Sequence, residues 1–568
     1  MQLLSTAASY YIKSVRTILK IDRRTSRIDI VTHAELAELD DWHILYNNVY
    51  GFIGKLVVDE LSFFLVILDA EEVGVFGKEP VYRIKKALAV PIIDDGVERP
   101  TYFDALSNHF DKLKSQQKRL FNFLTNRGLS SMKLAEDVVS LINDLGTFYF
   151  CKSLDLTLTM QRRALDSSEA IDEFWWNRNL LDDLIESDGK AKENASEWVL
   201  HIIHGYFDQR SLSYEDTSQL HLTLISRRSV NRAGVRYLRR GVDADGNVAN
   251  FVQTEMIISF GDHSLSFVQI RGSIPTFWSQ SGFKYRPPPI IDKPLNESLP
   301  AFKKHFQSLE TIYGSPILVI NLVDSTGREE KLGESFKQHI LELGMENVLY
   351  YPFDFHASSK TNGDQTSVLI DSMSSELQKI GFCWIDKTGQ IVREQRGIIR
   401  TNCIDCLDRT NFVQSAISRS IVSVQALKLG LIEPFIDTPE ILIQLLTSMW
   451  TAHGDCLSRQ YSGTDALRKN EKTTRHRQKF FGLMKNGINS AKRYTNAHIK
   501  DYKRQLAIDL LVSGKATTTA MKTDEQMAEM VATEAQSNSG STESGSSDEE
   551  SNKEKTAGNS RIVGETSL

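Results

Sequence analysis

The chain has 568 residues, of which 41% are hydrophobic and 25% are charged. This length is too great for one ordinary core, and this composition excludes a chain that is disordered throughout. The formal net charge is −6, but residues 523–568 hold ten acidic and three basic residues, so the remainder is nearly neutral and does not favour nucleic acid as a partner.

The first part of the chain is predicted to be rich in strands. Runs of apolar and β-branched residues between about residues 25 and 100, such as 63–70 and 87–93, are typical of strands. Between residues 102 and 163, apolar residues recur three and four positions apart, which predicts helices. We therefore expect a β-rich N-terminal subdomain over residues 1–185.

Strand-like and helix-like segments alternate in the following part of the chain. Strands are predicted at five segments and helices at residues 299–313 and after Thr410. The predicted strands are residues 220–227, 317–323, 347–355, 381–386 and 397–402. This alternation predicts an α/β catalytic domain over residues 186–512. Residues 513–568, rich in Ser, Thr, Glu and Gly and without aromatic residues, are expected to form a disordered acidic tail.

The cysteines and the apolar runs indicate where the protein works. Five scattered cysteines form no disulfide framework and favour a reducing, cytoplasmic compartment. The N-terminus lacks the pattern of a secretory signal, and no apolar run approaches the ~18 residues of a spanning helix. We expect a protein peripherally associated with cytosolic membrane faces, which either visits them directly or is held there by a recruiting protein.

The segment from residue 397 to 430 carries the chemistry. A β-branched run is followed by Cys403, five further residues and Arg409, and then by a predicted helix that Gly430 terminates. The apolar residues expected on one face of that helix are Phe412, Val413, Ala416, Ile417, Ile421, Val424 and Leu427. A tight loop between a strand and a helix N-terminus directs its amides at a common centre and binds phosphate.

The residue types suggest a cysteine-based phosphatase mechanism. Loop amides and the helix dipole lower the pKa of the Cys403 thiol, and only the thiolate is a competent nucleophile. Arg409 supplies two donors to the phosphate oxygens. The expected path is a phosphocysteine intermediate that water hydrolyses, with no metal ion or other cofactor.

The proton donor to the leaving alkoxide is left open by the sequence. Asp405 and Asp408 both lie in the loop, and each either donates the proton from a raised pKa or turns outward to orient Arg409. Asp354 or His356 serves instead if the strand that precedes them approaches the loop.

Other readings of the same residues exist. The bare Cys–x5–Arg spacing is common, and Cys403 with Cys406 also forms a C-x-x-C that suits a redox pair or half of a zinc site. No second close pair of Cys or His follows at ligand spacing, and the strand and helix on either side favour phosphate binding.

A dense stretch of arginines between residues 227 and 240 also has two readings. Its members are Arg227, Arg228, Arg232, Arg236, Arg239 and Arg240. They form either a solvated face paired with acids or a surface that contacts anionic lipid headgroups.

The segment RTNCIDCLDRTN, residues 400–411, resembles the signature loop of the Sac-domain phosphoinositide phosphatases. Further segments resemble blocks of that family in the same order, at residues 225–255, 269–280, 351–356 and 458–467. Together the similarity extends over about residues 40–512. The family's endoplasmic-reticulum members add two membrane spans and its synaptojanins add a second phosphatase domain, and neither is recognised in this sequence.

The resemblance implies a metal-independent enzyme that hydrolyses monophosphates of the inositol ring. Phosphatidylinositol 4-phosphate is the expected main substrate, with the 3-phosphate and the 3,5-bisphosphate as lesser ones. The expected catalytic residues are Cys403 as nucleophile, Arg409 as phosphate binder, and Asp405 and Asp408. The expected substrate-binding residues are Thr410, Lys360, Asn402 and Arg400. After residues 351–356 the family often has an acid, a cysteine and a lysine, of which this sequence retains only Lys360.

A second hypothesis is a catalytically weak phosphoinositide-binding or scaffold module. Sac-like domains that lack the reactive cysteine are of this kind, whereas here both Cys403 and Arg409 are present, which favours the enzyme.

Overall fold

Strands begin earlier in the chain than the sequence predicts. A computed structural model describes the protein except for residues 40–41, 94–125, 166–171, 186–190, 215–217, 237, 281–287, 354–364, 403, 406, 435, 437, 463–486 and 517–568. An antiparallel five-stranded sheet has the order β4-β3-β2-β1-β5. Its strands are β1 (Gln2–Ser5), β2 (Ser9–Lys13), β3 (Ile18–Asp22), β4 (Ile28–Val31) and β5 (His43–Tyr46).

A 14-stranded mixed sheet runs through most of the chain. Its order is β17-β16-β20-β13-β12-β11-β10-β9-β8-β7-β6-β21, with β18 pairing with β13 and β19 pairing with β18. Its strands are β6 (Gly51–Val58), β7 (Leu61–Phe76), β8 (Glu79–Ile92), β9 (Phe148–Cys151), β10 (Ile203–Tyr214), β11 (Ser218–Arg228), β12 (Val252–Phe260), β13 (His263–Gly272), β16 (Ile317–Asn321), β17 (Val348–Pro352), β18 (Cys383–Ile385), β19 (Ile391–Arg393), β20 (Ile398–Asn402) and β21 (Lys515–Ala516). A separate short pair joins β14 (Trp278–Ser279) and β15 (Ile290–Ile291).

The strands at one end of this sheet are parallel. β20 lies between β13 and β16 and pairs in parallel with both, and β17 continues the parallel set beyond β16. The carboxyl ends of these strands therefore meet at one edge, where open α/β sheets bind their ligands.

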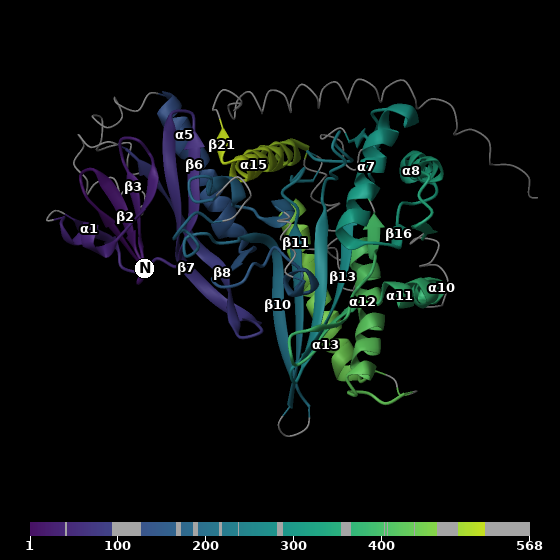
Figure 1. The fold of residues 1–568 in the computed structure, drawn as a ribbon. Coiled ribbons are helices and arrows are strands. Elements are labelled where there is room, and N and C mark those ends of the chain that lie inside the picture. Colours follow the sequence, from purple (N-terminus) through teal and green to yellow (C-terminus); the bar gives the residue numbers. More distant parts are fainter. Residues whose placement is uncertain are drawn as a thin grey trace, which may run out of the picture. The chain divides into compact units, whose positions relative to one another are not determined.

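Helices cover both faces of the parallel strands. The α-helices of the described residues are α1 (His33–Ala37), α5 (Asn126–Leu145), α6 (Met160–Ala164), α7 (Leu295–Tyr313), α8 (Glu330–Leu343), α10 (Gln365–Ser372), α11 (Ser374–Ile380), α12 (Asp408–Lys428), α13 (Glu440–Ser462) and α15 (Gly487–Ser513). Along β16, Ile317 and Val319 join the core of α7 and α8, whereas Leu318 and Ile320 join the core of α10 to α13. This alternation confirms the predicted α/β architecture, and Figure 1 shows α12 and α13 against the long strands.

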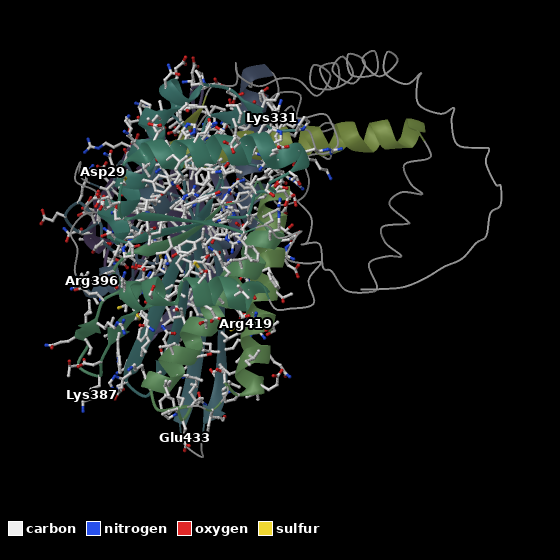
Figure 2. All side chains as sticks on the ribbon, turned by 90° about the vertical axis from the view of Figure 1, so that its right-hand side faces the viewer. Asp29, Lys331, Lys387, Arg396, Arg419 and Glu433 are labelled. Carbon is white, nitrogen blue, oxygen red and sulfur yellow. The ribbon has the colours of Figure 1, made fainter. Side chains whose placement is uncertain are left out.

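The helix α8 shows how such a layer faces both core and solvent. Leu332 and Phe336 are fully buried against the sheet, while Lys331 is exposed and its side chain lies at the periphery in Figure 2. No helix in the described parts of the chain combines the length and the apolar character that crossing a bilayer requires.

The helix α15 returns to the N-terminal strands. Its Ala507, Ile508 and Leu511 share one core with Ile53 of β6 and with α5, and β21 after it pairs with β6. The mixed sheet thus continues across residue 185, where we expect a subdomain boundary, and the boundaries themselves stay predictions. The tail expected from residue 513 lies outside the described residues beyond Ala516.

Candidate active site

The signature loop lies between the carboxyl end of β20 and the N-terminus of α12. β20 ends at Asn402 and α12 begins at Asp408, so the predicted strand and helix are both confirmed. Cys403 and Cys406 are outside the described residues. The flanking elements therefore have the strand–loop–helix order on which the predicted anion site depends.

Arg400 and Asn402 are buried in a polar network beneath the loop. Arg400 donates to Nε2 of His305 (3.0 Å), to Oδ1 of Asn402 (2.7 Å) and to the carbonyl of Ser273 (2.7 Å). Asn402 in turn donates to Oδ1 of Asn321 at the end of β16 (2.6 Å). These contacts fix the end of β20, and they engage polar groups of both side chains in hydrogen bonds within the protein.

His305 completes this network in its neutral form. Its Nδ1 lies 2.9 Å from the carbonyl oxygen of Gly246 and donates to it, so Nε2 accepts from Arg400. Burial, followed by the nearby Arg400 cation, lowers the pKa of His305 well below its usual value. A neutral imidazole is the form that this hydrogen-bond pattern requires.

Two arginines from the segment between β11 and β12 hold Asp405. Arg236 donates to Oδ2 of Asp405 and Arg240 donates to Oδ1. Arg240 also donates to the carbonyl of Ile404 (3.0 Å) and to Oε1 of Gln280 (2.9 Å), and its side chain is only 2% exposed. The first loop residues after Cys403 are thus fastened by a buried cation.

The same arginines set the protonation state of Asp405. Burial favours the neutral acid, but the charges of Arg240 and Arg236 outweigh burial and hold the pKa of Asp405 below its usual value. Asp405 is therefore ionised at neutral pH. Asp408, by contrast, is exposed in the first turn of α12.

Arg409 is held by the segment that joins β16 to α8. Its Nη1 donates to the carbonyl of Leu322 (2.9 Å) and to Oδ1 of Asp324 (3.0 Å), and its Nη2 lies 2.8 and 3.1 Å from the two carboxylate oxygens of Glu329. Neither acid was identified from the sequence, because each lies at least 80 positions before the arginine.

The first turn of α12 is tied to α13. Asn411 donates to the carbonyl of Trp450 (2.7 Å), and its Oδ1 accepts from Nδ1 of His453 (2.9 Å) and from Arg271 (3.3 Å). A Cβ on Gly454 would lie 2.7 Å from Nδ2 of Asn411, so glycine permits this close approach. Thr410 is fully buried, and its hydroxyl has no hydrogen-bond partner among the described residues.

The described cysteines are unsuited to nucleophilic attack. Cys151, Cys383 and Cys456 are buried and form no disulfide. Burial raises the pKa of Cys383 to about 12 and that of Cys456 to about 11. At neutral pH both remain thiols, which leaves the loop cysteines as candidates.

The arginine stretch is not one solvated face: some of its members are buried, whereas Arg239 is partly exposed and paired with Asp509, and contact with lipid headgroups stays a prediction. Arg227 is fully buried in an ion pair with Glu255 (2.8 Å), and Arg228 is buried against the ring of Tyr461. Arg236 and Arg240 hold the signature loop. The reading as a solvated face is wrong for the buried members, because their partners lie in distant strands and loops that the local pattern does not reveal.

Three further candidates are outside the described residues. These are Lys360, Asp354 and His356, which follow β17. Their predicted roles stay predictions.

The comparisons with known proteins agree with this geometry. Residues 50–360 match the model of the SacI homology domain family. The zebrafish phosphatidylinositide phosphatase SAC2 is 33% identical over 91% of this chain and 51% of its own length. The zebrafish phosphatidylinositol-3-phosphatase SAC1-A is 33% identical over 70% of this chain and 68% of its own length. The Arabidopsis phosphoinositide phosphatase SAC6 is 33% identical over 82% and 75%, respectively.

The chain belongs to the Sac-domain phosphoinositide phosphatase family. It spans about half the length of the zebrafish SAC2 and 36% of the length of the human SAC2. The match to the family model ends at residue 360, before the signature loop, whereas the match to the zebrafish SAC2 covers 91% of the chain.

Proposed function

We propose that this Sac domain removes monophosphates from the inositol ring of phosphoinositides. The expected main substrate is phosphatidylinositol 4-phosphate, followed by the 3-phosphate and the 3,5-bisphosphate. The observation that carries the proposal is the placing of the flanking elements: the parallel strand β20 ends at Asn402, directly before Cys403 in the sequence, and α12 begins at Asp408, directly before Arg409.

Cys403 is the proposed nucleophile. Its thiolate attacks phosphorus, the alkoxide of the inositol ring leaves, and water then hydrolyses the phosphocysteine. Arg409, the loop amides and the positive end of α12 stabilise the charge on the phosphate oxygens.

Asp408 is one proposed proton donor to the leaving alkoxide, and Asp354 and His356 are the alternatives that the sequence leaves open. The lowered pKa of Asp405 disfavours it as an acid, since a group that is ionised at neutral pH has no proton to give. Asp405 instead keeps the loop attached to Arg236 and Arg240. Arg400 and Asn402, expected from the sequence to bind the substrate, are proposed instead to fix the end of β20 before the loop, because their side chains bond within the protein. Thr410 and Lys360 are the remaining proposed contacts to the substrate.

We further propose that the protein acts at cytosolic membrane faces that contain phosphoinositides. The lipid substrate itself requires such a surface, and a recruiting protein is the alternative means of attachment.

Phosphate release from a panel of phosphoinositides tests the proposal. Wild type and Cys403→Ser are compared in mixed micelles with EDTA present. Release by the wild type alone supports a metal-independent cysteine phosphatase and identifies its preferred isomer. Liposome binding without release from any lipid would instead favour a binding or scaffold module.

A further inference from the structure

The two carboxylates that hold Arg409 come from outside the signature loop. Asp324 and Glu329 both lie in the short segment between β16 and α8. The side chains of all three residues are about one-fifth exposed, with 19% for Arg409, 20% for Asp324 and 17% for Glu329. In such a partly buried place, ion pairs are screened less than at an open surface.

These contacts occupy the donors that a phosphate needs. Nη1 of Arg409 has two hydrogens, and the carbonyl of Leu322 and the carboxylate of Asp324 both lie within hydrogen-bond distance of it. Nη2 faces both oxygens of Glu329. A two-pronged grip of arginine on a phosphate uses either both terminal nitrogens or one of them together with Nε, so it needs at least one of the nitrogens that these contacts engage. A substrate phosphate therefore competes with the carboxylates for donors of Arg409.

The segment that carries the carboxylates is fixed relative to the signature loop. The N–H of Leu322 donates to the carbonyl of Asn402, the last residue of β20 (2.8 Å). Oε2 of Glu329 accepts the N–H of Asp324 (3.0 Å), which closes the segment on itself. The backbone of this segment and the carboxylate of Glu329 are thus anchored, so a change of partner requires movement of the Arg409 side chain.

We propose that Asp324 and Glu329 are positioning residues that hold Arg409 in a resting orientation, from which the substrate phosphate withdraws it. The inference rests on the proposed function and adds a step to it. When only a fraction of a protein is in the binding-competent state, its apparent affinity for the ligand is the intrinsic affinity multiplied by that fraction. Loss of one carboxylate frees Arg409 more often and tightens the binding of a phosphate-like anion.

Calorimetric titration with tungstate, a tetrahedral oxyanion that is not turned over, tests this step. The full chain is compared with Glu329→Gln, Asp324→Asn and the control Glu330→Gln, which removes a neighbouring exposed carboxylate. We expect Glu329→Gln and Asp324→Asn to bind tungstate about fivefold more tightly, the change expected when the competent fraction rises from about one in ten to about one in two. Glu330→Gln should change the affinity by less than about twofold, and Glu329→Gln should have no effect in an Arg409→Lys background.

The outcomes separate this inference from the proposed function. Weaker tungstate binding by Glu329→Gln would mean that the carboxylate only orients Arg409, and equal tightening by Glu330→Gln would mean a general effect of charge. Either result overturns the inference while phosphate release by the wild type upholds the function. A wild type that neither binds tungstate nor releases phosphate overturns both. If Glu329→Gln does not fold, as judged by circular dichroism, Asp324→Asn carries the same comparison.

Discussion

Substitution of Arg240 by glutamine tests whether the signature loop depends on its buried cation. Arg240→Gln removes the ion pair with Asp405 and the hydrogen bond to the carbonyl of Ile404. A charge-assisted bond contributes ~1.5–3 kcal/mol and an ordinary one ~0.5–1.5 kcal/mol. If about 2.7 kcal/mol of the combined energy of these two interactions is needed to hold the loop in the transition state, kcat/KM falls about 100-fold.

The assay is phosphate release from phosphatidylinositol 4-phosphate by four variants. Arg239→Gln is the matched control, because its side chain is 37% exposed and pairs with Asp509 (3.2 Å) instead of the loop. We expect near wild-type kcat/KM for this variant. Asp405→Asn alone should lose activity comparably to Arg240→Gln.

The double variant Arg240→Gln/Asp405→Asn decides the matter. If both residues act through their shared contact, the loss of kcat/KM in the double variant is no greater than the larger of the two single losses. A loss equal to the product of the two single losses would refute the reasoning, because it would mean that Arg240 and Asp405 contribute independently.

Three further predictions concern thiols, pH and stability. Iodoacetamide at pH 7 should leave Cys383 and Cys456 unmodified in the folded protein, as mass spectrometry would show, because burial keeps both as thiols. The pKa of Asp405 is lower in the folded protein, so its stabilisation is present at neutral pH and is lost as the pH falls through that lowered pKa; the difference in thermal midpoint between wild type and Asp405→Asn should shrink on acidification. Glu255→Gln leaves the fully buried Arg227 without its counter-charge, at a cost of ~3–5 kcal/mol, and should lower the thermal midpoint strongly. Asp29→Asn removes an exposed ion pair with Arg27 and should change the thermal midpoint little; Asp29 is labelled in Figure 2. Similar effects of the two substitutions would contradict the special importance of the buried pair.

The sequence predicts the elements on either side of the loop but not the whole buried face of α12. Val413 and Ile417 are buried as expected, whereas Phe412 and Val424 are 47% and 43% exposed. Gln414 is buried instead, since its side chain donates to the carbonyl of Ile270 in β13 (2.9 Å). A hydrophobic pattern does not detect a polar side chain that pairs with a distant backbone group.

The sequence predicts the residues of the signature loop but not the residues that hold them in place. Arg409 and Asp405 follow from spacing within the loop, but their partners, such as Arg240 and Glu329, come from other elements. These partners are brought near by the order of the strands, in which β20 lies between β13 and β16. Strand order of this kind depends on contacts distant in the chain, and local residue patterns carry little information about it.

The return of α15 to the N-terminal strands has a consequence for synthesis on the ribosome. Leu511 completes the core that contains Ile53, more than four hundred and fifty positions earlier in the chain. The helix α5 covers part of this apolar face early in synthesis, but the part that α15 buries stays uncovered until nearly the whole chain has left the ribosome. A nascent chain of this kind has a long period in which chaperones can bind it, and a stop codon before α15 would leave that part of the face uncovered.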